Sequence, residues 1–250
     1  MADWSGAEAY ACSFAVVCAD AVPAALDARG TPRGRLLDVG SGPGTLALAA
    51  AARGWSVTAV EPEPAMRRLA RAAGLEPVDG ALPVLPFEDG AFEAVAANLV
   101  VNHLPDPRAG VAGLVRVAAP GGAVAVSIWG TGPASLSALW SEVLARAGVA
   151  PLPGSRLPPE RDFARTPDGL AALLSDAGLA AVRAEAVPLT TPLPRDDLWS
   201  AVEAGIGVIG ATWRAEGADG RARLRAAYES VVPGPRIEVR ATAVVASGNR

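Results

Sequence analysis

The residues with the clearest chemical pattern lie in the segment LLDVGSGPGTLALAAAARG, residues 36–54. An apolar run ends in Asp38, glycines follow at positions 40, 42 and 44, and an alanine-rich run comes next. A glycine turn at the carboxyl end of a strand lets a ligand approach the backbone, and the following helix offers free N–H groups. The pattern indicates a nucleotide-like ligand, although a turn that only joins a strand to a helix has the same composition.

The spacing of the glycines separates the ligands that such a loop can take. A dinucleotide loop reads G-x-G-x-x-G, whereas this loop reads G-x-G-x-G and has Thr45 at the last position of that pattern. A P-loop requires a lysine, and the chain contains none. Glu61 ends the next expected strand, and its carboxylate can accept from both ribose hydroxyls of any adenosine compound. The loop therefore favours an adenosine ligand other than a dinucleotide.

Apolar runs and helix-forming runs alternate along the chain. We expect strands over residues 35–39, 55–61, 75–80, 92–101, 123–129, 180–191 and 238–246. We expect helices over residues 5–29, 45–53, 63–74, 106–122, 130–148, 166–178, 196–214 and 220–232. Alternation of strand and helix predicts an α/β fold with a doubly wound, mostly parallel sheet of seven strands.

The bulk composition narrows the class of protein. The chain has 250 residues, 51% of them hydrophobic, and a net charge of −4, without the basic stripes typical of nucleic-acid binding. Cys12, Cys18 and the single histidine, His103, are too few and too scattered for a usual metal site, so we expect no metal and two reduced cysteines. The first ten residues do not resemble a signal peptide, and no apolar run is long enough to span a membrane. A soluble, cytoplasmic protein is expected.

Four segments, taken together, resemble the class I S-adenosylmethionine-dependent methyltransferases. They are DVGSGPG (38–44) with Glu61, LPFEDGAFEAV (85–95), LVVNHLPDP (99–107) and LVRVAAPGGAVAVSIW (114–129). The second segment is similar to the LPF-x-D-x-x-F-D-x-V segment of the small-molecule "type 11" branch, which includes ubiquinone-pathway, menaquinone-pathway and natural-product enzymes. The resemblance implies a Rossmann-like fold and covers roughly residues 33–130.

The resemblance also implies a domain organisation. Residues 1–250 would form a single methyltransferase domain, in which 1–32 are an N-terminal lid helix, 33–130 the cofactor-binding half, 131–235 the substrate-side helices and 236–250 the last strand. Residues 131–250 match no specific motif of the family.

The resemblance places the cofactor S-adenosyl-L-methionine against particular positions of this chain. They are Tyr10, Asp38, Gly40, Ser41, Gly42, Gly44, Glu61, Pro62, Met66, Gly80, Ala81, Leu82, Asn98 and Leu99. Asp38 would face the cofactor's ammonium group or order the loop, and Glu61 would bind the ribose. Asn98 would bind the amino-acid end through its side chain or backbone. Tyr10 is similar to a lid tyrosine that reaches the cofactor carboxylate, but its position also suits an aromatic residue of the core. Met66 likewise suits either the adenine site or core packing.

One position departs from the family pattern. Relatives usually carry G-D-x-x-x-L-P, with the aspartate on the adenine amine, whereas this chain has Ala81 after Gly80. Asp79 lies two positions before Ala81, and its side chain is expected to point elsewhere. Loss of one hydrogen bond, worth about 0.5–1.5 kcal/mol, would lower cofactor affinity up to about tenfold without abolishing binding.

The resemblance leaves the acceptor side less defined. Methyl transfer needs a general base only when the nucleophile must lose a proton of high pKa, and His103 is the candidate base unless it orders the loop after its strand. Aromatic residues outside the cofactor half are candidate pocket liners, although each also suits a core: Trp4, Phe14, Trp129, Trp140, Trp199 and Trp213. They favour a small, mainly apolar or aromatic acceptor, which points to natural-product biosynthesis.

Two other functions stay open at this stage. A protein of the same fold can bind S-adenosylmethionine and catalyse a rearrangement or cyclisation, or only bind a ligand, and no residue of the sequence excludes this. A nicotinamide-dependent oxidoreductase is the third alternative, and the glycine spacing argues against it.

Overall fold

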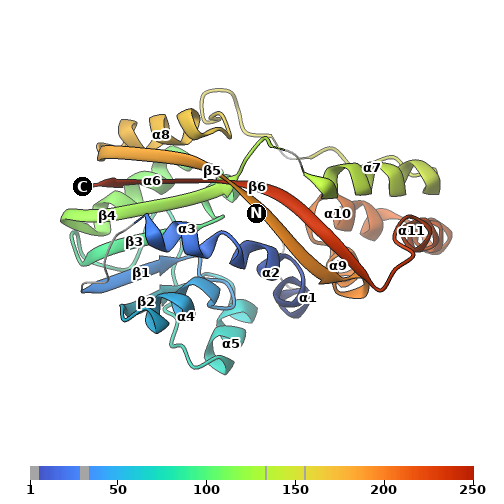
Figure 1. Cartoon of the computed structure of the whole chain (residues 1–250), viewed down its shortest axis with the longest axis horizontal. Coiled ribbons are helices and arrows are strands. Elements are labelled where there is room, and N and C mark those ends of the chain that lie inside the picture. Colours follow the sequence, from blue (N-terminus) through green and yellow to red (C-terminus); the bar gives the residue numbers. More distant parts are fainter. Residues whose placement is uncertain (1–5, 29–33, 133, 155) are drawn as a thin grey trace.

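The protein was analysed as a computed structural model, which describes residues 6–28, 34–132, 134–154 and 156–250. Within these residues one sheet of six strands forms the centre, in the order β2-β1-β3-β4-β6-β5 (Figure 1). The strands are β1 (Arg35–Val39), β2 (Ser56–Val60), β3 (Phe92–Asn98), β4 (Ala118–Trp129), β5 (Ala180–Pro194) and β6 (Arg236–Asn249). β1 to β4 are parallel, and β6 runs antiparallel between β4 and β5.

Helices cover both faces of this sheet. α3 (Val22–Asp27) and α4 (Thr45–Ala52) pack on one face, and α6 (Pro107–Val117) and α8 (Pro167–Asp176) pack on the other. Parallel strands buried on both faces are apolar throughout rather than alternating. Successive residues of β1 therefore enter different cores. Leu36 packs in the core under α3 and α4, and Leu37 packs in the core under α6 and α8. The doubly wound, mostly parallel α/β fold is confirmed.

The segment 75–80, expected as a strand, does not form one. The sheet of the described residues therefore has six strands instead of the expected seven. Only Val78 pairs with β2, through a single parallel bridge to Val60. Pro77 lacks a donor, and glycine and aspartate are poor strand formers, so the segment around Val78 supports one bridge and no ladder.

The single helix expected over 5–29 is three short helices where the structure describes it: α1 (Ala7–Cys12), α2 (Phe14–Ala19) and α3. The first break lies at Ser13, whose hydroxyl donates to the carbonyl of Ala9 and competes with helical bonding. The second break precedes Pro23, whose ring would clash with the carbonyl four residues earlier if the helix continued.

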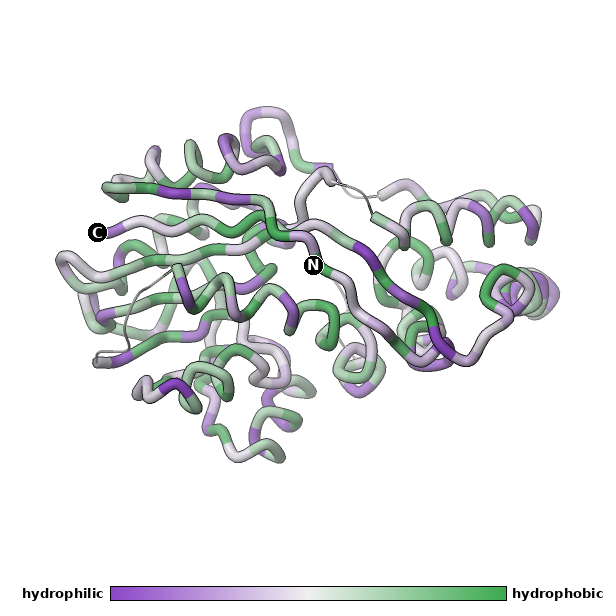
Figure 2. Tube along the Cα trace, in the orientation of Figure 1, coloured by the Kyte–Doolittle hydropathy of each residue, from purple (hydrophilic) through white to green (hydrophobic). Residues whose placement is uncertain are grey.

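A second group of helices lies at one end of the sheet and forms what we call the cap (Figure 1). It comprises α7 (Ser135–Ala147), α9 (Arg195–Glu203), α10 (Gly207–Ala215) and α11 (Ala218–Val231). β5 and β6 extend from the sheet to the cap as a long antiparallel ribbon, and α9 to α11 connect their far ends. Hydrophilic residues mark the outer cap helices, whereas the central strands of the sheet are mainly hydrophobic (Figure 2).

Candidate functional site

A cavity opens at the carboxyl ends of β1 and β3, where the strand order of the sheet reverses. Open doubly wound sheets bind their ligands at this place. The empty space at this site is about 330 Å³, the open solvent at its mouth included. Its walls come from the glycine loop, the N-terminal helices and the end of β3: Tyr10, Ala15, Cys18, Asp38, Gly40, Ser41, Gly42, Pro43, Thr45, Leu46 and Asn98. Six residues expected from the sequence thus meet here: Tyr10, Asp38, Gly40, Ser41, Gly42 and Asn98.

The glycine loop connects β1 to α4 in a backbone conformation that L-residues rarely adopt. Gly40, Gly42 and Gly44 all have positive φ, at 67°, 55° and 97°. Gly40 N–H donates to the carbonyl of Val60 over 2.8 Å, which fixes the loop against the end of β2. Gly44 is the N-cap of α4, and no side chain caps that end. The first N–H groups of α4 therefore have no side-chain cap, and the first two residues of the helix, Thr45 and Leu46, line the cavity wall.

Glu61 lies directly after β2, beside this loop. One carboxylate oxygen accepts from Gly42 N–H over 2.8 Å and the other from Glu63 N–H over 2.9 Å. The residue is only 6% exposed. Burial raises the pKa of this carboxyl above its ordinary value, although the two backbone donors and Arg67 act in the opposite direction. The carboxylate is thus fixed in orientation at the edge of the glycine loop.

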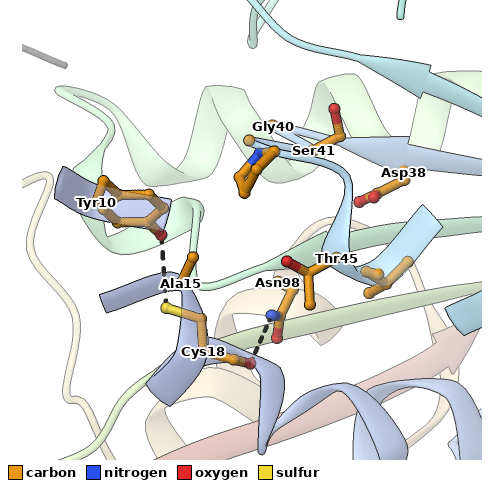
Figure 3. Close-up of a pocket in the computed structure, with 11 residues that line it drawn as sticks. Tyr10, Ala15, Cys18, Asp38, Gly40, Ser41, Thr45 and Asn98 are labelled. Atoms are coloured by element: carbon orange, nitrogen blue, oxygen red, sulfur yellow. Dashed lines mark hydrogen bonds between the residues drawn. The ribbon is translucent and has the colours of Figure 1, made fainter. Parts of the chain in front are cut away.

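Tyr10 and Cys18 reach the cavity from the N-terminal helices (Figure 3). The Tyr10 hydroxyl and the Cys18 Sγ are 3.5 Å apart. Burial raises the pKa of the Cys18 thiol to about 11 and that of Tyr10 well above its ordinary value. Both groups are therefore neutral at physiological pH. From the sequence, Cys18 was expected only as a reduced thiol. No helical spacing indicates its contact with Tyr10, because the break at Ser13 places the two residues on different helices.

Asn98 joins β3 to the N-terminal helices. Its Nδ2 donates to the carbonyl of Cys18 over 3.2 Å, and its Oδ1 accepts from the hydroxyl of Ser127 over 2.6 Å. Ser127 Oγ also accepts from the N–H of Leu99, which has a positive φ of 60°. The Asn98 side chain therefore fixes the position of α2, and the role expected from the sequence, contact with the cofactor's amino-acid end, stays a prediction.

The expected adenine side of the site lies at α5 (Pro64–Ala72). Met66 is buried in a small cluster with Ala7 and Ala65, against which Tyr10 packs, so α1 covers this part of α5. Pro62 is exposed beside it. Leu82 packs into the core with α6. Among the described cavity liners, none comes from the segment 80–82 or from positions 44, 61, 62, 66 and 99. Glu61 instead lies behind the wall, where it binds the N–H of the liner Gly42.

Asp79 does not replace the aspartate that the family pattern has at position 81. Its carboxylate binds Arg67, with Nη1–Oδ1 at 2.8 Å and Nη2–Oδ2 at 3.2 Å. Ala81 itself forms a backbone bridge with Val84. Arg67 was not predicted from the sequence. Nothing in its spacing indicates that it contacts residues both before and after α5 in the chain.

His103 ends the short helix η1 (Val101–His103), which follows β3. The cavity walls, as far as the structure describes them, do not include it. His103 is exposed, yet desolvation by the protein around the ring lowers its pKa below the ordinary value. The imidazole is therefore neutral at physiological pH, as a base must be, and its catalytic role stays a prediction.

The aromatic residues expected in a substrate pocket lie mainly in the core of the cap. Trp199 is 1% exposed and stacks on Tyr228 at 4.9 Å between ring centroids, with Trp140 on Tyr228 at 5.6 Å. Trp199 is thus a core residue, which corrects its expected role as a pocket liner. The half-buried members of the set pack against the same core: Phe14, Trp129, Trp140 and Trp213. Trp4 lies outside the described residues.

No group of three or more histidine, cysteine, aspartate or glutamate residues within the described part of the chain is arranged to bind a metal ion. No helix in the same part of the chain combines the length and the apolar character needed to cross a membrane.

The raised pKa of Glu61 predicts opposite effects of acid on binding and on stability. We expect affinity for an adenosine ligand to decrease as the pH is lowered, because protonation removes the acceptor for a ribose hydroxyl. The decrease should begin at a higher pH than for a glutamate with the ordinary pKa of 4.5. The folded state binds this proton more readily than the unfolded state, so the contribution of Glu61 to stability increases as the pH falls through the raised pKa. Calorimetric titration with S-adenosylhomocysteine between pH 8 and 5, beside thermal unfolding, measures both, and a Glu61→Gln variant should remove both trends.

Comparison with known proteins adds to this geometry. Residues 37–126 match the family model of the type 11 methyltransferase domain. An uncharacterized methyltransferase of Mycobacterium sp. (strain JLS) is 40% identical over 104 residues, which are 40% of this chain and 41% of that protein. A ubiquinone biosynthesis O-methyltransferase of Xanthomonas oryzae pv. oryzae (strain PXO99A) is 34% identical over 136 residues, 51% of this chain and 56% of that protein. The matches therefore span about half the length of these relatives.

The fold comparison extends over the whole chain. A solved structure from Thermotoga maritima, described as an S-adenosylmethionine-dependent methyltransferase and possible histamine N-methyltransferase, superposes with a TM-score of 0.56 at 16% identity. The superposition covers 99% of both chains and shows a shared fold. Residues 37–126, the segment with the glycine loop and Glu61, match a methyltransferase domain, and the chain is similar to S-adenosylmethionine-dependent methyltransferases in part of its sequence and in its fold.

Proposed function

We propose that this protein is an S-adenosylmethionine-dependent methyltransferase that acts on a small, mainly apolar or aromatic metabolite. One observation supports it above the others: the Glu61 carboxylate is fixed by Gly42 N–H at the edge of a cavity that the glycine loop lines. A carboxylate beside a glycine loop, at the carboxyl ends of parallel strands, is the arrangement that binds the ribose of an adenosine compound.

The residues around the cavity suit S-adenosylmethionine. Each Glu61 oxygen accepts one backbone N–H, and a carboxylate oxygen has two acceptor positions, so one position on each oxygen remains for a ribose hydroxyl. Asp38 is 1% exposed at the cavity wall and can face an ammonium group. Ser41 Oγ is buried without a hydrogen-bond partner among the described residues. Such a buried hydroxyl is expected to find a partner when the site is filled.

When bound, S-adenosylmethionine supplies a methyl group on a positively charged sulfur. The chain has to align an acceptor atom with that methyl group and exclude water, and alignment alone can supply about 7–11 kcal/mol. Tyr10, Cys18 and Asn98 form the wall contributed by the N-terminal helices and β3, and they include no group that is charged at neutral pH. In our proposal this wall excludes water, and His103 accepts a proton when the acceptor has one to lose.

The acceptor class rests on the cap and on the names of the relatives. Helices with an aromatic core lie next to the cofactor half, which suits an apolar acceptor. The relatives include a ubiquinone biosynthesis O-methyltransferase and, at 36% identity, a demethylmenaquinone methyltransferase of Clavibacter sepedonicus. We therefore propose a phenolic or quinol-type acceptor first and another natural-product aromatic second, in the cytoplasm.

Transfer of a labelled methyl group tests the proposal. The protein is incubated with S-adenosylmethionine labelled in the methyl group and with a panel of catechols, quinols and apolar amines. We expect label in at least one acceptor and release of S-adenosylhomocysteine. Binding of S-adenosylhomocysteine without transfer to any acceptor supports the alternative, a protein that binds this cofactor without methylation. Tight NADH binding without S-adenosylhomocysteine binding would contradict the proposal.

A further inference from the structure

We propose that Arg67 is a positioning residue for the cofactor site, which fixes the backbone that aims the Glu61 carboxylate at the ribose. The inference rests on the proposed function, because it concerns how the same site recognises adenosine. Arg67 does not line the cavity within the described structure and acts through Glu61.

The guanidinium of Arg67 contacts two segments that are apart in sequence. Nη1 is 2.7 Å from the carbonyl oxygen of Glu61, 2.7 Å from that of Pro62 and 2.8 Å from Asp79 Oδ1. Nη2 donates to Asp79 Oδ2 over 3.2 Å. The side chain of Arg67 is 12% exposed, whereas that of Asp79 is 73% exposed. The charged group is therefore largely enclosed by acceptors and does not form an ordinary surface ion pair.

The second segment is the remnant of the expected third strand. Val78 exchanges backbone hydrogen bonds with β2 on both sides of Val60: Val78 N–H donates to Ala59 and Glu61 N–H donates to Val78. No ladder continues from this bridge, so the direction of the chain after Val78 depends on other contacts. Asp79 is the next residue, and its hydrogen bond with Arg67 restrains the chain at this point.

Glu61 is thereby restrained at both ends of the residue. Arg67 binds its backbone carbonyl, and Gly42 and Glu63 bind its carboxylate through their N–H groups. The planar guanidinium presents several donors in a fixed arrangement, which suits two carbonyls and a carboxylate better than a single ammonium. Without Arg67, the backbone at Glu61 and Pro62 loses its side-chain donor, and the carboxylate is restrained only by the N–H groups of Gly42 and Glu63.

The charges around Glu61 come from three elements. Burial raises the pKa of Glu61 most, the backbone N–H of Glu63 lowers it, and the Glu63 carboxylate charge raises it to a smaller extent. The charge of Arg67 in α5 lowers this pKa, and Tyr10 of α1 faces Glu61 as a neutral phenol. Loss of the Arg67 charge therefore favours the protonated carboxyl, and the decline of binding in acid should begin at a higher pH.

The same contact gives Asp79 a role that does not include the adenine. A carboxylate bound by both Nη atoms of Arg67 is oriented toward α5. This chain has Ala81 at the position of the aspartate that usually binds adenine. In our proposal Arg67 and Asp79 compensate for that loss, because they hold Glu61 in a fixed position for the ribose.

Binding of two ligands tests the inference. The probes are S-adenosylhomocysteine and its 2′-deoxyribose analogue, titrated by calorimetry into the wild-type chain and into Arg67→Met. The wild type should prefer the ribose compound by about tenfold or more, because the analogue leaves a buried carboxylate position without a donor. Arg67→Met should bind S-adenosylhomocysteine about tenfold more weakly, equivalent to roughly 1.4 kcal/mol, and its preference for ribose should approach one.

Matched variants separate positioning from general loss of structure. Arg71→Met removes an arginine from the same helix that is 50% exposed and contacts Glu76 at 3.8 Å, and it should leave both affinities unchanged. Arg67→Lys should recover part of the affinity, and its pH profile should stay closer to that of the wild type. Asp79→Asn is a second variant, which retains the guanidinium of Arg67. It should reduce the ribose preference by a smaller factor than Arg67→Met does.

The outcomes are distinct. An equal loss of affinity for both ligands in Arg67→Met, with the ribose preference unchanged, assigns Arg67 a general structural role and overturns the inference while the proposed function stands. Unchanged affinities in Arg67→Met and Asp79→Asn overturn it as well. Failure of the wild type to bind either ligand overturns both the proposed function and the inference.

Discussion

Replacement of Glu61 by glutamine is expected to weaken binding of S-adenosylhomocysteine by about 30-fold. The amide keeps one acceptor oxygen but presents an NH2 group to one of the two backbone N–H groups, of Gly42 or of Glu63, that each donate to a carboxylate oxygen in the wild type. A hydrogen bond to a charged group is worth about 1.5–3 kcal/mol, and about 2 kcal/mol corresponds to that factor. Isothermal titration at neutral pH measures the change.

Glu76→Gln is the control for this variant. The side chain of Glu76 is 91% exposed and makes only a distant contact with Arg71, so both affinity and stability should stay at the wild-type level. Glu61→Gln should also alter stability in a pH-dependent way, because it replaces a buried carboxyl whose pKa is raised. Wild-type affinity in Glu61→Gln would show that this carboxylate does not bind the ribose.

Alanine at position 40 is expected to destabilise the fold by about 2–5 kcal/mol. The backbone there has a φ of 67°, and an added Cβ would lie 2.7 Å from Val100 Cγ2. The left-handed conformation costs roughly 1–2 kcal/mol for a residue with a side chain, and overpacking adds about 1–3 kcal/mol. Urea unfolding, followed by tryptophan fluorescence, measures the free energy of unfolding.

Gly42→Ala is the matched variant, because its φ of 55° carries the same conformational cost while the nearest atom to an added Cβ is Tyr10 Cε1 at 4.0 Å. We expect it to lose only about 1–2 kcal/mol of stability. The added methyl group would occupy the space toward Tyr10 at the cavity wall, so binding of S-adenosylhomocysteine should weaken markedly. Equal losses of stability in the two variants would contradict the assignment of Val100 as the obstacle.

The local part of the site was predictable from the sequence. Glycines at 40, 42 and 44 between an apolar run and an alanine-rich run define a strand–turn–helix unit, since few other conformations suit so many positive φ values. Glu61 follows from the same logic, because parallel neighbouring strands end at the same edge of the sheet. These features depend on residues that are close in sequence or on adjacent strands.

The parts that failed depend on contacts distant in sequence. The segment around Val78 has enough apolar character for a strand, but whether a ladder forms depends on its partner, and only one bridge exists. Trp199 suits a pocket wall and a core equally well by its chemistry, and its stacking on Tyr228 decides for the core. The bond from Asn98 to Cys18 joins residues 80 positions apart, which no local pattern shows.

The position of β6 inside the sheet has a consequence for the order in which the protein can assemble during synthesis. β5 reaches the sheet only through β6, and β6 is made after α9, α10 and α11. While these cap helices emerge, β4 still lacks its outer neighbour, and its unpaired edge can bind other strands. The parallel half can thus form early, whereas closure of the sheet and attachment of the cap must occur together and late. We expect the nascent chain to be most prone to aggregation in this interval.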